Sequence, residues 1–362
     1  TYRWAWEGLQ AGLFKLNFKS LSLNQYQQIG AFFINQGKNI LITFIVATLV
    51  IEGKLTLGMM LAIQYILGQL NSPIEQLIGF TQQAQDAKIS LERLNDIHSL
   101  DDEELVNIEY NHALPLEHSI HIKNLSFTYP GAGNEPVLKN INLVIPQGKV
   151  TAIVGMSGSG KTTLVKLLLR FYESYKGEIH LGTANFKTIS PKYWRSISGA
   201  VMQDSFIFND NIQKNIIVTG DKPDNERLIH ACQTANILPF IESLPLGFYT
   251  KLGAEGNGIS GGQKQRLSIA RAVYKNPQFI FFDEATNSLD ANNEKVILEN
   301  MQEFFKARTV IIVAHRLSTV KNADKIIVLN NGEIAEEGTH AELTLRKGKY
   351  YELVKNQLEL GN

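Results

Sequence analysis

The sequence predicts two parts of different fold class, an all-α helical hairpin followed by an α/β domain. Two apolar stretches, residues 29–51 and 55–70, are separated only by a polar turn at 52–54. Helices joined by so short a turn lie antiparallel. From about Ser119, short apolar strands alternate with turns and helices, which is typical of an α/β domain. The composition therefore divides the chain near residue 100.

The overall composition excludes several kinds of protein. The 35 basic and 35 acidic residues balance, so the charge does not indicate nucleic-acid binding. The single cysteine, Cys232, excludes an internal disulfide and a multi-cysteine metal site, and we expect it to be a small buried side chain in a reducing compartment. The chain begins at Thr1 without a signal-peptide pattern, so we expect it to be part of a longer protein.

The hairpin is long and apolar enough to be a transmembrane helical hairpin. A bilayer span needs roughly 20 residues, so we expect spans over about 25–51 and 55–80 within a membrane part of residues 1–97. Polar residues such as Asn35 and Gln64 interrupt both spans, and they are costly against lipid. We expect them to face a water-filled pathway or a neighbouring helix. A soluble helical hairpin is the alternative.

The second helix is predicted to extend beyond the bilayer. Residues 77–97 keep apolar side chains at helical spacing but become too polar for lipid. An unbroken helix from Leu55 to Ile97 is about 60 Å long at 1.5 Å per residue, with a kink expected at Pro73. Basic residues flank both outer ends of the hairpin, while Lys54 alone lies in its turn. By the positive-inside rule, both flanks are cytoplasmic.

The soluble domain, expected over 119–358 after an acidic linker of residues 98–118, contains a phosphate-binding motif. A short buried strand, 149–155, runs into a glycine-rich loop and then a helix. In this motif the backbone N–H groups surround the β-phosphate, Lys161 reaches the β and γ oxygens, and the Thr162 hydroxyl ligates Mg²⁺. The residues expected at the nucleotide are Gly155, Ser157, Gly158, Ser159, Gly160, Lys161, Thr162 and Thr163.

Two further strands end in chemically active side chains. The run 279–286, FIFFDEAT, places two acids at the end of an apolar strand, where α/β sheets bind their ligands. We expect Asp283 on the Mg²⁺ side and Glu284 as the acceptor of a proton from the attacking water. His315 ends another apolar strand. A histidine there serves structure as often as function, but beside the other motifs it is a candidate γ-phosphate sensor.

A second phosphate-binding feature follows about a hundred residues after the first. The stretch 259–266, ISGGQKQR, has two glycines behind Ser260 and then residues that start a helix well. Glycines at a helix N-terminus present backbone N–H groups and a positive dipole end to an anion. The sequence therefore predicts two sets of phosphate donors in one domain.

In order and spacing, these motifs resemble the nucleotide-binding domain of ABC transporters. The resemblance covers Ser119 to about Gln357, and the hairpin looks like the last two transmembrane helices of an ABC exporter half. It implies an α/β P-loop ATPase domain, an ABC cassette with an antiparallel β subdomain and a helical signature subdomain. The motifs that carry it are FTYP, GMSGSGKTT, VMQDS, ISGGQ, FIFFDEAT, NSLD and VAHR.

The resemblance also implies roles for residues to which the sequence pattern alone assigns none. Tyr129 stacks on adenine, Gln203 reads Mg²⁺ and couples to the membrane domain, and Asp290 contacts the opposite subunit. The signature motif closes over the γ-phosphate held by a second cassette, so two ATP molecules join a homodimer or a heterodimer of halves. The signature residues are Ser260, Gly261, Gly262 and Gln263.

Residues 50–94 further resemble the bacterial exporters that carry an N-terminal cysteine peptidase and export bacteriocin-type peptides while trimming their double-glycine leaders. The peptidase itself is absent from this sequence. Three small departures from the family pattern occur. Ile259 replaces the commoner leucine, Asn287 replaces serine, and the segment before the signature lacks an arginine, which leaves Glu255 as the matching charge.

Together these observations predict an ATP-hydrolysing half of an ABC exporter in the bacterial inner membrane, with its nucleotide-binding domain in the cytoplasm. Its expected ligands are ATP and Mg²⁺. The expected partners are a second half-transporter, membrane lipid and a peptide or protein cargo, but no nucleic acid. A lipid or drug exporter is the alternative within the class. Soluble ABC ATPases of DNA repair or translation share the motifs but lack the apolar hairpin.

Overall fold

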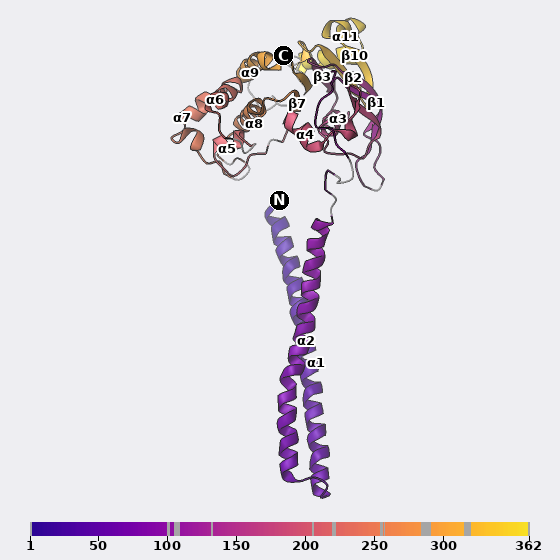
Figure 1. Cartoon of the computed structure of the whole chain (residues 1–362), viewed down its shortest axis with the longest axis vertical. Coiled ribbons are helices and arrows are strands. Elements are labelled where there is room, and N and C mark those ends of the chain that lie inside the picture. Colours follow the sequence, from indigo (N-terminus) through magenta and orange to yellow (C-terminus); the bar gives the residue numbers. More distant parts are fainter. Residues whose placement is uncertain are drawn as a thin grey trace. The chain divides into compact units, whose positions relative to one another are not determined.

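The computed structural model of the chain contains two compact units, Thr1–Asp101 and Asp102–Asn362. The first unit is helical, and the second contains two β-sheets and several helices (Figure 1). The structure describes residues 2–99, 102–104, 109–131, 133–204, 206–218, 222–253, 256, 258–283, 291–314 and 320–360.

The first unit is a hairpin of two long helices. Helix α1 (Tyr2–Ile51) and helix α2 (Leu57–His98) run antiparallel along each other from a short turn (Figure 1). Thr56 caps α2, because its hydroxyl oxygen accepts a hydrogen bond from the backbone N–H of Met59 at 3.3 Å. Helix α2 continues through Pro73 to His98, so the predicted long helix is confirmed.

Helix α1 has the properties of a membrane span. Its segment Trp6–Ile51 is long and apolar enough to cross a bilayer, and 6% of its most apolar window is buried within the structure. By the same criteria α1 is the one such helix in the described part of the chain, so the second span stays a prediction. Phe32, Phe33 and Phe44 are exposed on α1. Apolar surface of this extent requires lipid or further protein to cover it.

The second unit contains a four-stranded antiparallel sheet in the order β2-β1-β4-β5. Strand β1 pairs antiparallel with β2 on one side and with β4 on the other. This sheet is the antiparallel β subdomain that the resemblance implies. The strands are β1 (Ile120–Phe127), β2 (Leu138–Ile145), β4 (Lys176–Leu181) and β5 (Ala184–Asn185).

A six-stranded sheet in the order β10-β9-β3-β8-β7-β6 forms the centre of this unit. Its strands are parallel except β10, which pairs antiparallel with β9. The carboxyl ends of β3, β7 and β8 consequently share one edge. The strands are β3 (Val150–Gly155), β6 (Ser198–Val201), β7 (Phe279–Asp283), β8 (Thr309–Val313), β9 (Lys325–Asn330) and β10 (Glu333–Gly338).

Helices cover this sheet and form a separate group. Helix α8 packs against α5 and α6, and Figure 1 shows α5 to α9 together on one side of the unit. Two 3₁₀ turns, η1 (Phe186–Thr188) and η2 (Gly247–Tyr249), join neighbouring elements. The helices are α3 (Lys161–Leu168), α4 (Pro191–Ile197), α5 (Ile212–Ile216), α6 (Asn225–Thr234), α7 (Leu238–Ser243), α8 (Gly261–Lys275), α9 (Ala291–Phe305), α11 (His340–Arg346) and α12 (Lys349–Leu360).

The central sheet separates two apolar cores, because successive side chains of a strand point to opposite faces. Ile153 and Phe281 face the antiparallel sheet and α3, whereas Val154 and Phe282 face the helical group. Cys232 lies in the second core, where burial raises the pKa of its thiol to about 12. This confirms Cys232 as a small buried side chain.

Candidate functional site

The glycine-rich loop follows β3 and leads directly into α3. Gly155 and Gly160 have φ angles of 155° and 100°, which side chains with a Cβ rarely adopt. A Cβ on Gly155 would lie 2.2 Å from the carbonyl oxygen of Leu329, and one on Gly160 would lie 2.7 Å from Leu138 Cδ2. Both positions therefore require glycine, which brings the loop backbone close to β9 and β2.

The interior of this loop is suited to an anion. Gly160 begins α3 without a side-chain cap, so the first N–H groups of the helix are available to a ligand. The buried hydroxyl of Ser159 has no hydrogen-bond partner among the described residues. Lys161 is 5% exposed, and its ammonium donates to the carbonyl oxygens of Gly155 and Met156, each at 2.9 Å. Its positive charge thus lies within the loop.

Two predicted Mg²⁺ ligands meet at the mouth of the loop. Asp283 is the last residue of β7 and is fully buried, and Thr162 is the second residue of α3. The Thr162 hydroxyl donates to Asp283 Oδ1 at 3.1 Å, although the two residues are 121 positions apart in sequence. A hydroxyl beside a carboxylate is an oxygen donor set that Mg²⁺ accepts. The residues present therefore fit this ion.

The predicted signature residues form the start of α8. The Ser260 hydroxyl oxygen accepts from the N–H of Gln263 at 3.2 Å, and Gln263 Oε1 accepts from the N–H of Ser260 at 2.8 Å. This capping box leaves Gly261 and Gly262 in the first turn, where N–H groups have no acceptor within the helix. Ser260 and Gly261 are exposed, so these donors face outward.

The remaining predicted residues are placed by the sheet or fall outside the structure. Val201 of β6 pairs with Phe282, so Gln203, two residues later and exposed, belongs to the edge where Asp283 ends. The other catalytic and contact candidates lie outside the described residues. These are Glu284, Asp290 and His315, together with the departure positions Glu255 and Asn287.

Residues 138–287 match the family model described as ABC transporter. This stretch runs from β2 through the glycine-rich loop and the start of α8 to just beyond Asp283. The C-terminal unit belongs to the ABC transporter family. The fold class expected from the sequence is thereby confirmed, and the unit is called the ABC domain below.

Individual relatives match both units of the chain. The alpha-hemolysin translocation ATP-binding protein HlyB of Escherichia coli O157:H7 is 39% identical over 347 residues, which are 96% of this chain and 49% of HlyB. The exotoxin translocation ATP-binding protein PaxB of Pasteurella aerogenes is 40% identical over 357 residues, which are 98% of this chain and 49% of PaxB. The chain thus spans about half the length of these curated relatives.

A solved structure shares the fold. The structure of a bacterial Atm1-family ABC exporter with ATP bound superposes with a TM-score of 0.75 at 34% identity, covering 84% of this chain and 53% of that exporter. This similarity agrees with the exporter type that was expected from the sequence.

One aromatic side chain of the ABC domain has a contact that the sequence did not predict. Tyr129 follows β1, and its hydroxyl lies 3.0 Å from Thr163 Oγ1 in α3. Its ring meets Tyr172 edge to face, with ring centroids 5.3 Å apart. Sequence reasoning identified Tyr129 as an adenine platform but missed Tyr172, whose signal is the aromatic pair directly after α3. The two contacts fix the orientation of the Tyr129 ring.

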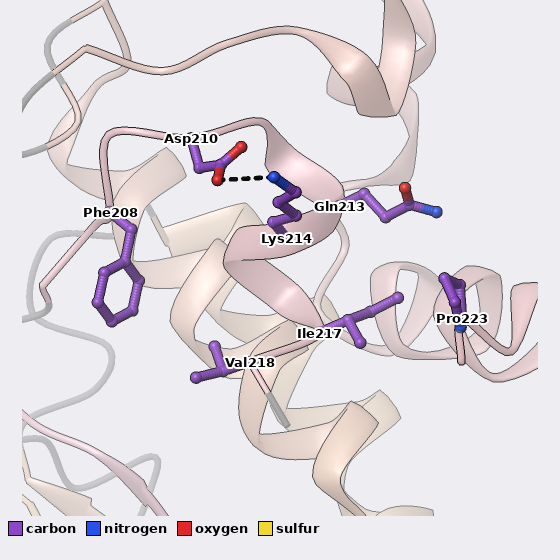
Figure 2. Close-up of a pocket in the computed structure, with 7 residues that line it drawn as sticks. All are labelled: Phe208, Asp210, Gln213, Lys214, Ile217, Val218 and Pro223. Carbon is purple, nitrogen blue, oxygen red and sulfur yellow. Dashed lines mark hydrogen bonds and ion pairs between the residues drawn. The ribbon is translucent and has the colours of Figure 1, made fainter. Parts of the chain in front are cut away.

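A separate hollow of about 480 Å³ lies beside α5 (Figure 2). Asp210 and Lys214 form an ion pair of 3.1 Å at this hollow, and the apolar side chains of Phe208 and Val218 are exposed there. No residue of the glycine-rich loop lines it. The lining residues are Phe208, Asp210, Gln213, Lys214, Ile217, Val218 and Pro223.

We expect Lys161→Ala to weaken ATP binding, because the buried ammonium is the charge that the loop holds closest to a phosphate. Hydrogen bonds to charged groups contribute about 1.5–3 kcal/mol, so the dissociation constant should rise about 10- to 100-fold. Titration calorimetry measures this change. Lys166→Ala, in the last turn of α3, is the matched control and should bind ATP like the parent. Equal weakening in both variants would contradict a specific role for Lys161.

Proposed function

We propose that this chain is the ATP-hydrolysing part of an ABC exporter half, which moves peptide or protein cargo outward across the bacterial inner membrane. The observation that carries the proposal is the Thr162–Asp283 pair at the mouth of the glycine-rich loop. The same chain contains an apolar helix of membrane-spanning length. Relatives named for toxin translocation support a protein cargo.

In the proposed reaction the loop N–H groups and Lys161 bind the phosphates of ATP. Thr162 and Asp283 would hold Mg²⁺, with Gln203 at the same edge, and the ion would supply neutralisation of phosphate charge. Glu284 follows Asp283 in the chain and accepts a proton from the water that attacks the γ-phosphate. His315 follows β8 and contacts the γ-phosphate. The products are ADP and inorganic phosphate.

The exposed start of α8 is proposed to complete the site of a second chain. Ser260 uses its oxygen lone pairs within the capping box, so its O–H group remains free to donate to a phosphate oxygen. The N–H groups of Gly261 and Gly262 and the positive end of the helix dipole add to this attraction. A dimer of halves then binds two ATP molecules at its interface and separates after hydrolysis, with Asp290 as a further contact.

We also propose that the hollow beside α5 is a docking surface for a further protein segment of the exporter, outside this chain. Phe208, the first lining residue of the hollow in chain order, follows shortly after Gln203. A contact at the hollow is therefore close in sequence to the sheet edge where we expect the nucleotide. Its exposed Phe208 and Val218 suit an apolar protein contact, which an isolated ABC domain leaves in water. This contact is the proposed path by which closure of the dimer is coupled to transport.

A lipid or drug exporter remains the alternative for the cargo. The peptide and protein assignment rests on relatives of which this chain covers about half. A soluble ABC ATPase of DNA repair or translation is disfavoured by α1, whose apolar side chains lack cover within the structure. Reconstitution of the full-length exporter in vesicles with labelled candidate cargoes distinguishes these classes.

Glu284→Gln should retain ATP binding but lose most turnover. The substitution removes the proton acceptor and leaves Lys161, Thr162 and Asp283 in place, and general-base catalysis contributes about 10²–10⁴-fold. Phosphate release and nucleotide binding are measured on the same preparation. Hydrolysis at the parent rate would remove Glu284 from the role of base.

A mixture of two inactive chains should recover nucleotide trapping. A Lys161→Ala chain and a Ser260→Arg chain each lack one half of every site as homodimers. In the mixed dimer, one site combines both defects, whereas the other joins an intact loop to an intact signature. Vanadate should therefore trap nucleotide in the mixture but in neither component alone.

The controls for this mixture are subunit exchange, followed by two affinity tags, and a mixture of two tagged Lys161→Ala chains. If each chain closed its signature over its own ATP, every site would keep one defect. A mixture that exchanges subunits but stays untrapped would exclude the shared site.

Val218→Asp should separate hydrolysis from transport. The substitution places a charge in the hollow beside α5 without touching the loop, so ATP binding should be unchanged while cargo export by the full-length protein falls about tenfold or more. Ile229→Asp, at an exposed position of α6, is the matched control and should export normally. Normal export by the Val218 variant would argue against docking at this hollow.

A further inference from the structure

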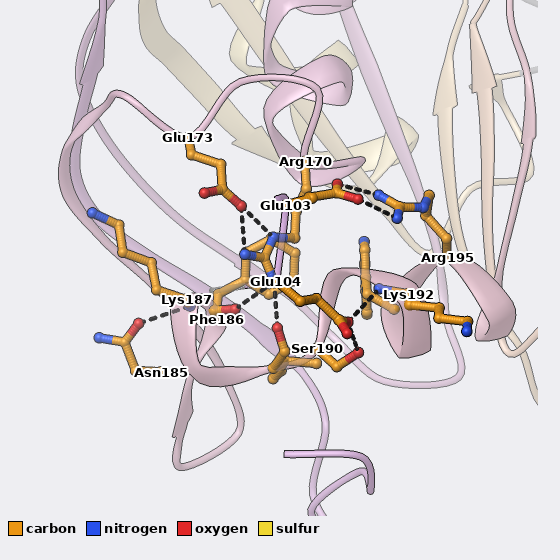
Figure 3. Close-up of polar contacts among 12 residues, drawn as sticks. Glu103, Glu104, Arg170, Glu173, Asn185, Phe186, Lys187, Ser190, Lys192 and Arg195 are labelled. Atoms are coloured by element: carbon orange, nitrogen blue, oxygen red, sulfur yellow. Dashed lines mark hydrogen bonds and ion pairs between the residues drawn. The ribbon is translucent and has the colours of Figure 1, made fainter. Parts of the chain in front are cut away.

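The linker before the ABC domain is bound to α4 by two adjacent carboxylates (Figure 3). Both guanidinium NH₂ groups of Arg195 donate to the carboxylate of Glu103. The next residue, Glu104, accepts from the Ser190 hydroxyl and, at 3.3 Å, from the N–H of Lys192. The first described residues of the second unit are thus attached to both the start and the middle of α4.

Helix α4 is itself firmly fixed in the core. Ser190 caps the helix, because its hydroxyl oxygen accepts from the N–H of Tyr193 at 3.0 Å. The fully buried Trp194 donates from its indole N–H to the carbonyl oxygen of Leu168 at 2.9 Å. Arg195 therefore extends from a helix that is anchored in the core of the domain.

The linker pairs with the same region a second time. The N–H of Asn111 donates to Thr188 O at 2.8 Å, and its carbonyl oxygen accepts from the N–H of Ser190 at 3.0 Å. This is a short parallel bridge opposite Ile189. The described linker residues thus contact the region of α4 at two places, 103–104 and Asn111.

Arg195 also contacts the signature helix. The ammonium of Lys275, the last residue of α8, donates to the main-chain carbonyl oxygen of Arg195. Burial lowers the pKa of Lys275, and the charge of Arg195 lowers it further. One residue thus binds the linker with its side chain and the end of α8 with its backbone. Helix α8 has 15 residues and a length of about 22 Å, and Ser260 caps its other end.

The charges around Arg195 are complementary to the acidic linker. A hollow of about 860 Å³ beside α4 is lined by four other cationic side chains besides Arg195, and by Asp224 as the one acid among its lining residues. The hydrogen bonds from Arg195 hold the pKa of Glu103 below its usual value although burial opposes this. The four other cations are Lys192, Lys222, Arg227 and Lys275.

We propose that Glu103, Arg195 and Lys275 form a polar relay. It joins the linker that follows α2 in the chain to the signature helix α8. Arg195 and Lys275 are then positioning residues: they touch no nucleotide, but they set where Ser260 stands when two ABC domains close. The inference rests on the proposed shared ATP site and adds a route by which the linker and that site affect each other.

The test uses the full-length exporter with three variants, Glu103→Gln, Arg195→Ala and Lys275→Met. Each should lower kcat for ATP hydrolysis about three- to tenfold with an unchanged nucleotide dissociation constant, because the relay acts only when domains close. Asp102→Asn removes an adjacent linker charge, and Lys222→Met removes a cation of the same hollow. Both matched controls should hydrolyse ATP like the parent.

A double variant with exchanged charges tests whether the specific Glu103–Arg195 pair, rather than the overall charge of the region, affects the rate of ATP hydrolysis. The exchanged pair Glu103→Arg with Arg195→Glu restores opposite charges and leaves the backbone carbonyl for Lys275, so it should recover at least about half of the lost rate. Loss of activity in the Asp102 control to the same extent, or failure of the exchanged pair to recover, would overturn the relay.

Hydrogen exchange on the nucleotide-free chain keeps the two proposals distinguishable. Glu103→Gln should speed exchange at residues 102–104 and in the last turn of α8 about two- to fivefold, as expected for a partly exposed ion pair. A parent protein without ATPase activity would refute the proposed function and leave this readout intact. Unchanged exchange in an active protein would refute the relay alone.

Discussion

The ABC domain depends on one constraint, which is that its parallel strands end at the same edge of the sheet. The hydrogen bond between Thr162 and Asp283 is a direct result of that constraint. Because β3, β7 and β8 run in the same direction, the glycine-rich loop, Asp283 and the carboxyl end of β8 meet at one edge of the sheet. The two apolar cores on either face of the sheet hold that edge in place. The central sheet and its two cores also position the helical group, which includes the cap of α8 and the hollow beside α5.

The sequence predicts those parts of the site whose signals are local. Gly155 and Gly160 are recognisable because a strand must turn sharply there, and Asp283 because it ends an unbroken apolar run. The Tyr129–Thr163 contact and the Glu103–Arg195 pair are not predictable in this way. Their partners are 34 and 92 positions apart, and neither periodicity nor turn chemistry relates one to the other. The linker was accordingly recognised as acidic, but not as part of the domain surface.

The domain contains two helix N-termini suited to phosphate, and they differ in construction. Helix α3 begins at a glycine without a side-chain cap, and the loop encloses its donors together with the ammonium of Lys161. Helix α8 begins with a complete capping box and is exposed. The first is an enclosed cradle, whereas the second presents its donors at the surface of the domain. This difference in construction accounts for two phosphate-binding features in one domain.

The capping box of α8 has an energetic consequence. Because Ser260 and Gln263 satisfy each other, the first turn of the helix is already folded before any phosphate arrives. A donor group that is pre-organised loses little conformational entropy on binding, so more of the interaction energy is available for association. The first turn of α8 also stays folded when the phosphate leaves, so dissociation is not accompanied by unfolding. In the proposed dimer, association and separation of two such surfaces would therefore require no slow refolding step.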